Sequence, residues 1–479
     1  PATAGDVHVD SVLGSDATGD GSAAAPWQTL TFALAQVAAG DVVHVGAGVH
    51  DAALGESFPI VVPLRVEVRG AGIGSTVIDG DGADELVIVI GDWLKSEQLS
   101  LSGMTLTDAG VGLGVGAVLT PAGARVERVE VTNVELGVKA GGVASSYGLR
   151  LEDCLVHDCV TGFAAGAISS GGGGSVSFVG GEIRDCSEYG AYVWADVGGK
   201  GWGYLARARV SGCGIALVAS GQDTAIDLEQ SLVSGCHAAA SLWHLAWLRL
   251  RGSTLTGNGA GISFPVTGFE RIELDGSIVW GNGFYDLDPA MVVSARYSNT
   301  NPLLPGTGNL AVDPRFLDPQ GGDFHLAPGS PLVDVGDPAL PPGGTDLDGD
   351  PRVLDGDSDL SSRVDIGHDE RNPVALGVSG TPVLGATLGL DVAAPAGWFA
   401  FAAVALDTAD LALGPFGSLL VDPFASVPLG SGPAPWSGTL SLPPDPVLAG
   451  LELFLQALGV DLPGGAGSFS NRVELAVAP

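Results

Sequence analysis

The chain of 479 residues is poor in lysine and in positive charge. It has 20 Lys and Arg residues against 55 Asp and Glu, a formal net charge of −35, and no lysine after Lys200. Such a chain repels phosphate backbones, so nucleic acid is not an expected partner. The same charge disfavours anionic membrane surfaces and leaves two explanations open, which are solubility and the binding of cations at clustered aspartates.

Long hydrophobic runs are also missing. The best candidate, residues 392–406, is interrupted by Pro395 and Gly397, so no transmembrane segment is expected. With 75 Gly and 30 Pro in a chain that is 46% hydrophobic, long helices are unfavourable and many short strands joined by turns are favoured. The chain begins at Pro1 rather than Met, which suggests a processed start. We therefore expect the protein to be secreted or displayed on the cell surface.

Cysteine is scarce, and the five that occur raise the question of a metal site. The stretch LEDCLVHDC (151–159) places Cys154, His157 and Cys159 close together, but a structural zinc site needs four ligands. The rest of the chain suggests another explanation, because one frame of alternating apolar residues recurs along it. Copies of this frame end at positions 109, 134, 159, 186, 213, 236, 258 and 282, so the period lies between 22 and 27 residues.

This period indicates a solenoid of stacked parallel strands with one coil per repeat. Four cysteines share the last position of the repeat, and Asn258 and Asn282 occupy it in the next copies. Equivalent residues on neighbouring coils lie about 4.8 Å apart, so these side chains should form a ladder. We expect buried free thiols, with a disulfide between neighbouring rungs as the alternative. The ladder consists of Cys159, Cys186, Cys213 and Cys236.

Two further segments carry a resemblance to a known family. Residues 9–50 contain a G-S-D loop, P-W-x-T-L, a short helix pattern and G-D-x-V-x-V, and residues 345–370 contain D-x-D-G-x-x-R followed by D-I-G. Over residues 1–371 the chain resembles right-handed parallel β-helix proteins of the pectate-lyase-like class, and bacterial surface proteins of the choice-of-anchor Q type. His368 and Asp369 replace the Ala-Tyr pair of that closing motif. The resemblance implies a fold rather than an activity.

The expected architecture is therefore all-β, a parallel β-helix with an N-terminal helical cap and a C-terminal β-sandwich-like domain. We expect the cap in residues 1–60, with a helix at 29–39, and the β-helix in residues 61–300. A closing coil and Asp-rich loop should follow in residues 301–371, before a domain at 372–479 that offers a possible contact for a homo-oligomer.

Three functions are compatible with this fold. The chain is expected to be a structural or polysaccharide-binding protein, a polysaccharide lyase or glycoside hydrolase, or a subunit of an extracellular filament or surface assembly. Tryptophan rings stack on sugars, although they also fill cores or shield edge turns, and a hydrolase or lyase needs positioned acids and bases. The candidate catalytic residues are Asp196, Lys200, Asp223 and His244, and the candidate carbohydrate-binding residues are Trp194, Trp202, Trp243 and Trp247.

The run DLDGDPRVLDGDSD suggests a calcium site, because its alternate acids repeat nine residues apart. Hard carboxylate oxygens are ligands that Ca²⁺ prefers, although neither run has the EF-hand pattern. Two alternatives remain. The family resemblance offers an arginine lock, in which Arg352 or Arg363 bonds to Asp346 or Asp365, and aspartates also form turns by bonding their own backbone. The candidate ligands are Asp346, Asp348, Asp350, Asp355, Asp357 and Asp359.

Overall fold

The computed structural model describes the chain except residues 1–4, 91–98, 117–121, 143–145, 168–171, 197, 265–270, 341–343, 357–362, 414–417, 464–466, 471 and 479. By packing, the chain divides into two compact units. The first contains residues 1–274 and 279–294, and the second contains residues 275–278 and 295–479. Within the described ranges, no helix has the length and apolar character needed to cross a membrane.

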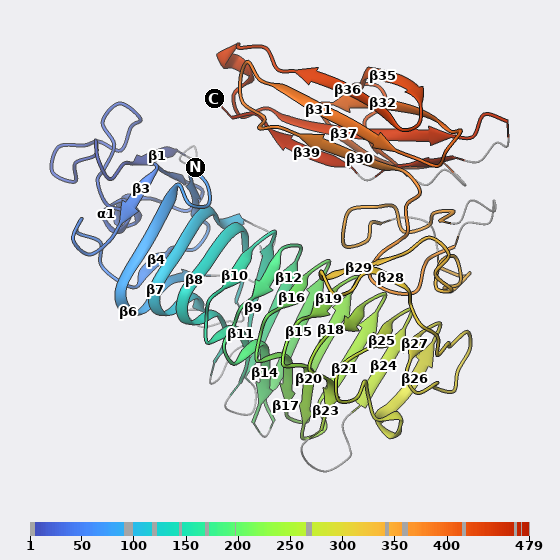
Figure 1. Cartoon of the computed structure of the whole chain (residues 1–479). Coiled ribbons are helices and arrows are strands. Elements are labelled where there is room, and N and C mark those ends of the chain that lie inside the picture. The colour runs from blue at the N-terminus through green and yellow to red at the C-terminus, as the bar shows by residue number, and fades with distance from the viewer. Residues whose placement is uncertain are drawn as a thin grey trace. The chain divides into compact units, whose positions relative to one another are not determined.

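The first unit is a parallel β-helix, as predicted. Each strand pairs in parallel with the strand one coil further on, and Figure 1 shows these strands stacked side by side. Three sheets result. Sheet I contains β9, β12, β15, β18, β21 and β24, sheet II contains β10, β13, β16, β19 and β22, and sheet III contains β11, β14, β17, β20 and β23.

The strand bounds of this part of the chain are β1 (Asp6–Val9), β2 (Val42–Val45), β3 (Gly48–His50), β4 (Ile60–Val62), β5 (Glu67–Gly70), β6 (Thr76–Ile90), β7 (Leu99–Gly116), β8 (Ala122–Gly142), β9 (Ser146–Glu152), β10 (Leu155–His157), β11 (Thr161–Ala167), β12 (Gly173–Val179), β13 (Glu182–Arg184), β14 (Tyr189–Ala195), β15 (Lys200–Ala206), β16 (Arg209–Ser211), β17 (Ile215–Ser220), β18 (Thr224–Glu229), β19 (Leu232–Ser234), β20 (Ala238–Trp243), β21 (Trp247–Arg251), β22 (Thr254–Thr256), β23 (Ala260–Ser263), β24 (Arg271–Asp275) and β25 (Ile278–Trp280).

The corner between sheets II and III shows why the repeat has its sequence. Just before each ladder position the backbone takes a positive φ, which only glycine, asparagine and aspartate adopt at low cost. These residues are Asp108, Asn133, Asp158 and Asp185 at φ angles of 53° to 57°, followed by Gly212, Gly235, Gly257 and Gly281 at 64° to 72°. The corner residue thus changes from acidic or polar to glycine along the solenoid.

The ladder is present as predicted, with all four of its cysteines buried and free. Where asparagine takes over, it bonds along the stack. The backbone N–H of Cys236 donates to Asn258 Oδ1 at 3.0 Å, and Asn258 Nδ2 donates to Asn282 Oδ1 at 2.9 Å. Cys154 lies outside this row, in the position that Ser231 and Ser253 occupy in later coils.

The helical cap is α1 (Leu30–Gln36), shorter than the predicted 29–39 because Val37 is already extended. Thr29 is its N-cap and accepts from the N–H of Phe32. The buried Glu56 accepts the next free backbone amides, from Leu30 at 2.6 Å and Thr31 at 2.8 Å. A carboxylate at this place satisfies amides that a helix start leaves unpaired.

The second unit contains the closing segment and an antiparallel domain. In that domain, β30, β31 and β36 form one sheet, and β35, β32, β37 and β38 form another in which β39 also pairs with β37. Both sheets contribute to one core that includes Leu390, Trp398, Ala400 and Leu455.

The remaining bounds are η2 (Pro289–Met291), β26 (Val292–Arg296), β27 (Asn299–Thr300), β28 (Phe316–Asp318), β29 (Asp323–Leu326), β30 (Ala375–Ser379), β31 (Thr387–Ala393), β32 (Phe399–Ala405), β33 (Thr408–Ala412), β34 (Ser418–Val421), β35 (Val427–Pro433), β36 (Trp436–Ser441), η4 (Pro446–Leu448), β37 (Glu452–Val460), β38 (Gly467–Phe469) and β39 (Val473–Ala476).

Candidate functional site

The four predicted sugar-binding tryptophans lie along one edge of the β-helix, where sheet III turns into sheet I. Trp194 ends sheet III strand β14, and Trp202 lies near the start of β15. Trp243 ends β20, and Trp247 starts β21. Sequence patterning therefore identified four residues that the fold brings to one edge. We call this set the tryptophan edge.

Trp202 is the most exposed of these rings, with 46% of its surface accessible. Its register partner on the next strand is the small Ala225, whose own partner one coil further on is Trp247. The indole Nε1 donates a hydrogen bond of 2.7 Å to Asp227 Oδ2, two residues beyond Ala225 on the same outward face. This bond fixes the direction of the exposed indole.

Asp227 is held firmly in this arrangement. It is only 7% exposed, and Arg249 Nη1 donates to both of its oxygens, at 3.0 and 3.3 Å. The Arg249 guanidinium in turn lies 5.2 Å from the Trp247 ring centroid, and Arg271 lies 5.3 Å from the same centroid. Two tryptophans are thus connected through a carboxylate and an arginine, and cation–π contact stabilises the far ring.

Tyr204 completes this outward face beside Trp202. The two rings have centroids 6.1 Å apart, and the Tyr204 hydroxyl donates to Glu229 Oε2 at 2.9 Å. Burial, with the Glu229 bond adding to it, raises the pKa of Tyr204 to about 12. The phenol therefore stays neutral and serves as a hydrogen-bond donor rather than as a base.

Sequence reasoning missed Tyr204, Asp227 and Arg249. The signal was available in the repeat frame, because each of them follows the outward position of Trp202, Ala225 or Trp247 by two residues. In a strand such residues share a face.

The other two tryptophans form a second row on sheet III. Trp194 pairs in register with Ser220, and Ser220 pairs with Trp243. The Trp194 ring stacks on Tyr192 at 5.5 Å, and Trp243 Nε1 donates to Ser241 Oγ at 2.9 Å. Trp243 is 37% exposed, and none of the four tryptophans is fully buried. The interpretation that these rings fill the core is therefore disfavoured.

The four predicted catalytic residues are exposed and lie on this same edge. Asp196 and Asp223 lie on turns that precede β15 and β18, and Lys200 is the first residue of β15. His244 has a positive φ of 56° and its Nδ1 lies 3.4 Å from Ser220 Oγ. Among the described residues, no hydrogen bond or ion pair joins any two of the four. Their catalytic role stays a prediction.

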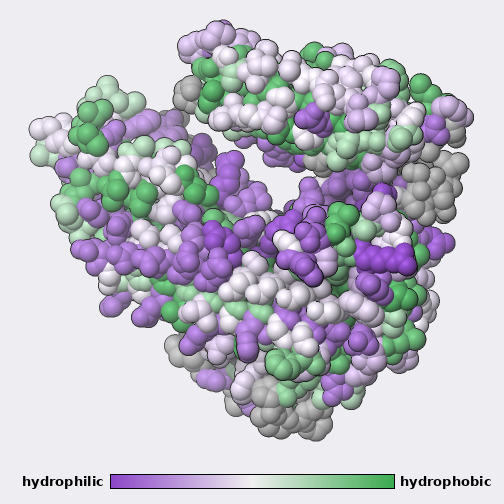
Figure 2. Space-filling model, in the orientation of Figure 1, coloured by the Kyte–Doolittle hydropathy of each residue, from purple (hydrophilic) through white to green (hydrophobic). Residues whose placement is uncertain are grey.

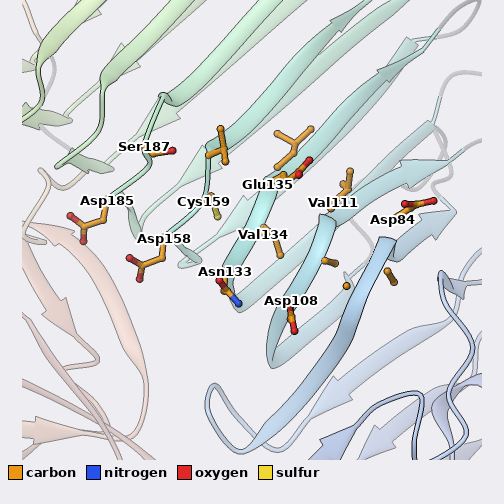
Figure 3. Close-up of a pocket in the computed structure, with 16 residues that line it drawn as sticks. Asp84, Asp108, Val111, Asn133, Val134, Glu135, Asp158, Cys159, Asp185 and Ser187 are labelled. Atoms are coloured by element: carbon orange, nitrogen blue, oxygen red, sulfur yellow. The ribbon is translucent and has the colours of Figure 1, made fainter.

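A second surface feature is an acidic groove of about 910 Å³ on the earlier coils. Figure 3 shows its lining residues arranged rung by rung, with the corner residues Asp108, Asn133, Asp158 and Asp185 in sequence. Asp84 and Glu135 add further carboxylates, and Cys159 of the ladder contributes to the lining. Figure 2 shows hydrophilic residues over part of the early coils, beside hydrophobic ones, and also over later parts of the chain. The groove therefore attracts positive charge.

The predicted calcium ligands are only partly brought together, all within the second unit. Asp346, Asp350 and Asp369 form one group whose ligand atoms lie within 4.8 Å of one another, and His325, Asp348 and Asp369 form another. We call these five residues the acidic centre. Two oxygens that each lie about 2.4 Å from one ion are at most about 4.8 Å apart, so the spacing fits calcium.

Hydrogen bonding within the acidic centre also supports the turn explanation. Asp346 Oδ1 accepts from the N–H groups of Asp348 and Asp350, at 3.0 and 2.8 Å, and its Oδ2 accepts from Glu370 at 2.8 Å. Its carboxylate therefore holds the loop whether or not an ion binds. Asp350 Oδ1 accepts from Asn372 Nδ2 at 2.8 Å.

The acidic centre has strongly shifted pKa values. Burial, and then the charges of Asp350 and Asp369, raise the pKa of Asp346 well above its ordinary value. Burial likewise raises the pKa of Asp350 to about 7 and that of Asp369 to about 6. The bond to Asp348 raises the pKa of His325 to about 10, so this imidazolium supplies one positive charge among four carboxyl groups.

The remaining calcium predictions have different outcomes. Asp355 is buried but belongs to neither group, while Asp357 and Asp359 lie outside the described residues. Asp369, at one of the two positions that depart from the closing motif, belongs to both groups and was missed by the sequence prediction. The predicted arginine lock takes another form, because Arg352 pairs with Glu370 at 3.4 Å. Asp365 instead accepts from the backbone of Asp334 and Arg371.

Comparison with known proteins supports the fold. Residues 12–143 match a family model described as a protein of unknown function (DUF1565). No curated protein matches the chain. Among solved structures, pectate lyase Pel9A is similar with 14% identity and a TM-score of 0.55, covering 78% of this chain and 97% of that one.

Two further solved structures are more distant. The A-module of mannuronan C-5 epimerase AlgE4 from Azotobacter vinelandii has 15% identity and a TM-score of 0.27, covering 56% of this chain and 88% of that one. A rhamnogalacturonan lyase has 14% identity and a TM-score of 0.26, covering 65% and 90%. The Pel9A likeness shows the parallel β-helix fold alone. The choice-of-anchor Q assignment stays a prediction.

Proposed function

We propose that this chain is a polysaccharide-binding β-helix protein, secreted or displayed on the cell surface, and that the glycan lies along the tryptophan edge. The observation that carries the proposal is Trp202, which is 46% exposed and whose indole Nε1 is fixed by Asp227. A rigid, flat aromatic surface binds the apolar face of a sugar ring with little loss of conformational entropy.

The neighbouring polar groups suit recognition of sugar hydroxyls. Glu229 accepts from the Tyr204 hydroxyl, so this pair has a fixed direction before a ligand arrives, while Asp227, shared between Trp202 and Arg249, holds the indole in place. Binding sites of this kind combine apolar stacking with a few positioned polar groups. The similarity to polysaccharide lyases and an epimerase in fold is compatible with this proposal but does not carry it.

Binding is favoured over catalysis as the primary role of the edge. A hydrolase needs two carboxyl groups that flank the scissile bond, and a lyase needs a base that can remove a proton. Asp227 has its oxygens engaged by Trp202 and Arg249, which makes it a positioning group. The enzyme hypothesis is tested by alanine at Asp196, Lys200, Asp223 and His244. Any lyase or hydrolase activity that survives the four substitutions removes those residues from consideration.

The binding proposal is tested by affinity gel electrophoresis against a panel of neutral and acidic polysaccharides. We expect at least one polysaccharide to retard the wild-type chain, and Trp202→Ala to lose this retardation. Trp202→Phe should retain part of it, because it keeps a ring without the indole N–H. Phe424→Ala is the matched control, because Phe424 is a 99% exposed aromatic residue in the other unit. Equal retardation of Trp202→Ala and the wild type would contradict the proposal.

We also propose that the acidic centre binds Ca²⁺ in a structural role. Support comes from the all-carboxylate group of Asp346, Asp350 and Asp369, whose spacing fits calcium–oxygen distances. The homo-oligomer contact through residues 372–479 and the filament hypothesis likewise stay predictions. Native mass measurement of the purified chain decides between a monomer and an assembly.

A further inference from the structure

The cysteine ladder forms a continuous row of sulfur atoms inside the first unit. Strand register pairs His157 with Arg184, Arg184 with Ser211, and Ser211 with Ser234, and each ladder cysteine lies two residues beyond one of these. The register therefore stacks the four thiols in one row, and each of them also contacts the carbonyl oxygen two residues before it, at 3.2 to 3.5 Å. The spacing along such a row is about one strand separation, roughly 4.7–4.9 Å.

This spacing matches the geometry of a two-coordinate metal. A bond between a thiolate and a soft metal is about 2.3 Å long, so two such bonds in line span about 4.6 Å. A cation on the ladder axis would therefore bond the sulfurs above and below it without moving the coils. Zinc is excluded from this arrangement, because its structural sites need four ligands around one centre, whereas soft thiolates in line suit Cu⁺.

The path to the ladder is also suited to a cation. Cys159 lines the acidic groove, together with the carboxylates of Asp108, Glu135 and Asp158. A groove with charge of one sign raises the local concentration of ions of the opposite sign. The first thiol of the ladder thus lies directly beneath a surface that attracts cations.

We propose that the ladder binds Cu⁺ or a similar soft cation, one ion between Cys159 and Cys186 and a second between Cys213 and Cys236. Each ion forms two metal–sulfur bonds and displaces two thiol protons, which leave to solvent. The backbone N–H of Cys213 donates to Cys236 Sγ at 3.4 Å and helps to stabilise the thiolate form. No oxidant or reductant is required, because sulfur and metal keep their oxidation states.

Cys154 provides an internal control for this proposal. It is equally buried and, like the ladder thiols, contacts the carbonyl oxygen two residues before it, here Glu152 O at 3.3 Å, but it belongs to the other row, which Ser231 and Ser253 continue in later coils. Burial raises the pKa of Cys154 to about 12. A single buried thiol without a sulfur neighbour supplies one bond to a soft cation and not two.

The test is anaerobic titration of the reduced full chain with Cu⁺ held by a coloured competing chelator. We expect the wild type to withdraw two Cu⁺ per chain, and Cys154→Ala to withdraw the same number. Cys186→Val, which conserves volume in the core, should withdraw no more than one. Circular dichroism of each variant separates loss of sites from loss of fold.

A second readout counts the thiols that remain reactive after unfolding without removal of copper. We expect a fall from five to one in the loaded wild type, because only Cys154 stays unbound. The proposal is overturned if the folded wild type takes no Cu⁺ from the chelator. It is also overturned if Cys154→Ala withdraws as little Cu⁺ as Cys186→Val does, because the ladder would then not be the binding site. Both outcomes can be read whether or not the valine variant folds.

Discussion

Single residues on the outward face of sheet I decide how Trp202 is presented. The small side chain of Ala225 leaves room for the indole, and Asp227 fixes its direction through the Nε1 bond. Neither residue contacts a sugar in this account, and both act by shaping the aromatic surface. Substitutions at these positions should therefore change binding more than they change folding.

Asp227→Ala tests this at the residue scale. The change releases the indole and leaves Arg249 without its closest carboxylate, so we expect glycan affinity to fall about tenfold, which is about 1.4 kcal/mol. Asp227→Asn keeps an acceptor for Trp202 Nε1 and should bind better than the alanine variant. Calorimetric titration of both variants with an oligosaccharide that binds the wild type measures these affinities. If the alanine variant binds as well as the asparagine variant, the Nε1 bond does not position the ring.

The two cysteine rows predict opposite responses to serine. Serine already occupies the Cys154 position in later coils, where Ser231 Oγ donates to Glu229 O at 2.8 Å. Cys154→Ser should therefore cost little. Cys186→Ser has an acceptor in Arg184 O, which lies 3.5 Å from the thiol, but it replaces a sulfur in the row of thiols by a smaller hydroxyl and should destabilise the chain by about 1–3 kcal/mol. Urea unfolding of both variants measures the difference, and equal losses would contradict the assignment of the rows.

At the scale of elements, the helical cap depends on Glu56 more than on its own sequence. Glu56 accepts two backbone amides at the start of α1, and His50 Nδ1 lies 3.4 Å from its Oε1. Burial pushes the pKa of Glu56 up, but the nearby His50 and the bonds from Thr31 and Leu30 outweigh it and the pKa is lowered. Its contribution to stability is therefore fully present above the unfolded pKa, about 4.3, and is lost as pH falls through the folded pKa.

Glu56→Gln should accordingly destabilise the chain by about 1–2 kcal/mol at neutral pH, in the range of lost helix caps. The deficit should shrink below about pH 4, where the wild-type carboxylate takes up its proton. Thermal unfolding of both proteins across this range is the measurement. A deficit that is independent of pH would show that packing, rather than charge, accounts for the cap.

The acidic centre can be tested separately from the helical cap. An ion that binds only the folded chain raises its unfolding midpoint, so chelator should lower the midpoint and calcium should restore it. Asp369→Asn should abolish this response, because Asp369 is one of the three carboxylates whose oxygens can share one calcium ion. Asp355→Asn, outside both groups, should keep it. A midpoint that excess calcium leaves unchanged would favour turn formation by Asp346 as the only role.

For the whole molecule, the fold was predictable because each coil of the β-helix repeats the same pattern of strands and turns. The ladder cysteines, the glycine or aspartate before them and the alternating strands recur at one period, so a single sequence shows them several times. The acidic centre was only half predictable. His325 and Asp369 lie far from Asp346 in sequence and reach it through the closing segment, which does not repeat. The role of Asp227 depends on which residues of neighbouring coils lie opposite one another. This register is known only once the strands have been paired in a structure.

The central claim is that the exposed indole of Trp202 binds a polysaccharide. Calorimetric titration of the wild type, Trp202→Ala and Phe424→Ala with an oligosaccharide of the polysaccharide that binds in the screen tests it most directly. We predict saturable binding by the wild type and by Phe424→Ala, and an affinity at least tenfold lower for a folded Trp202→Ala. Unchanged affinity of the Trp202→Ala variant would contradict the account, because the glycan would then bind elsewhere on the chain.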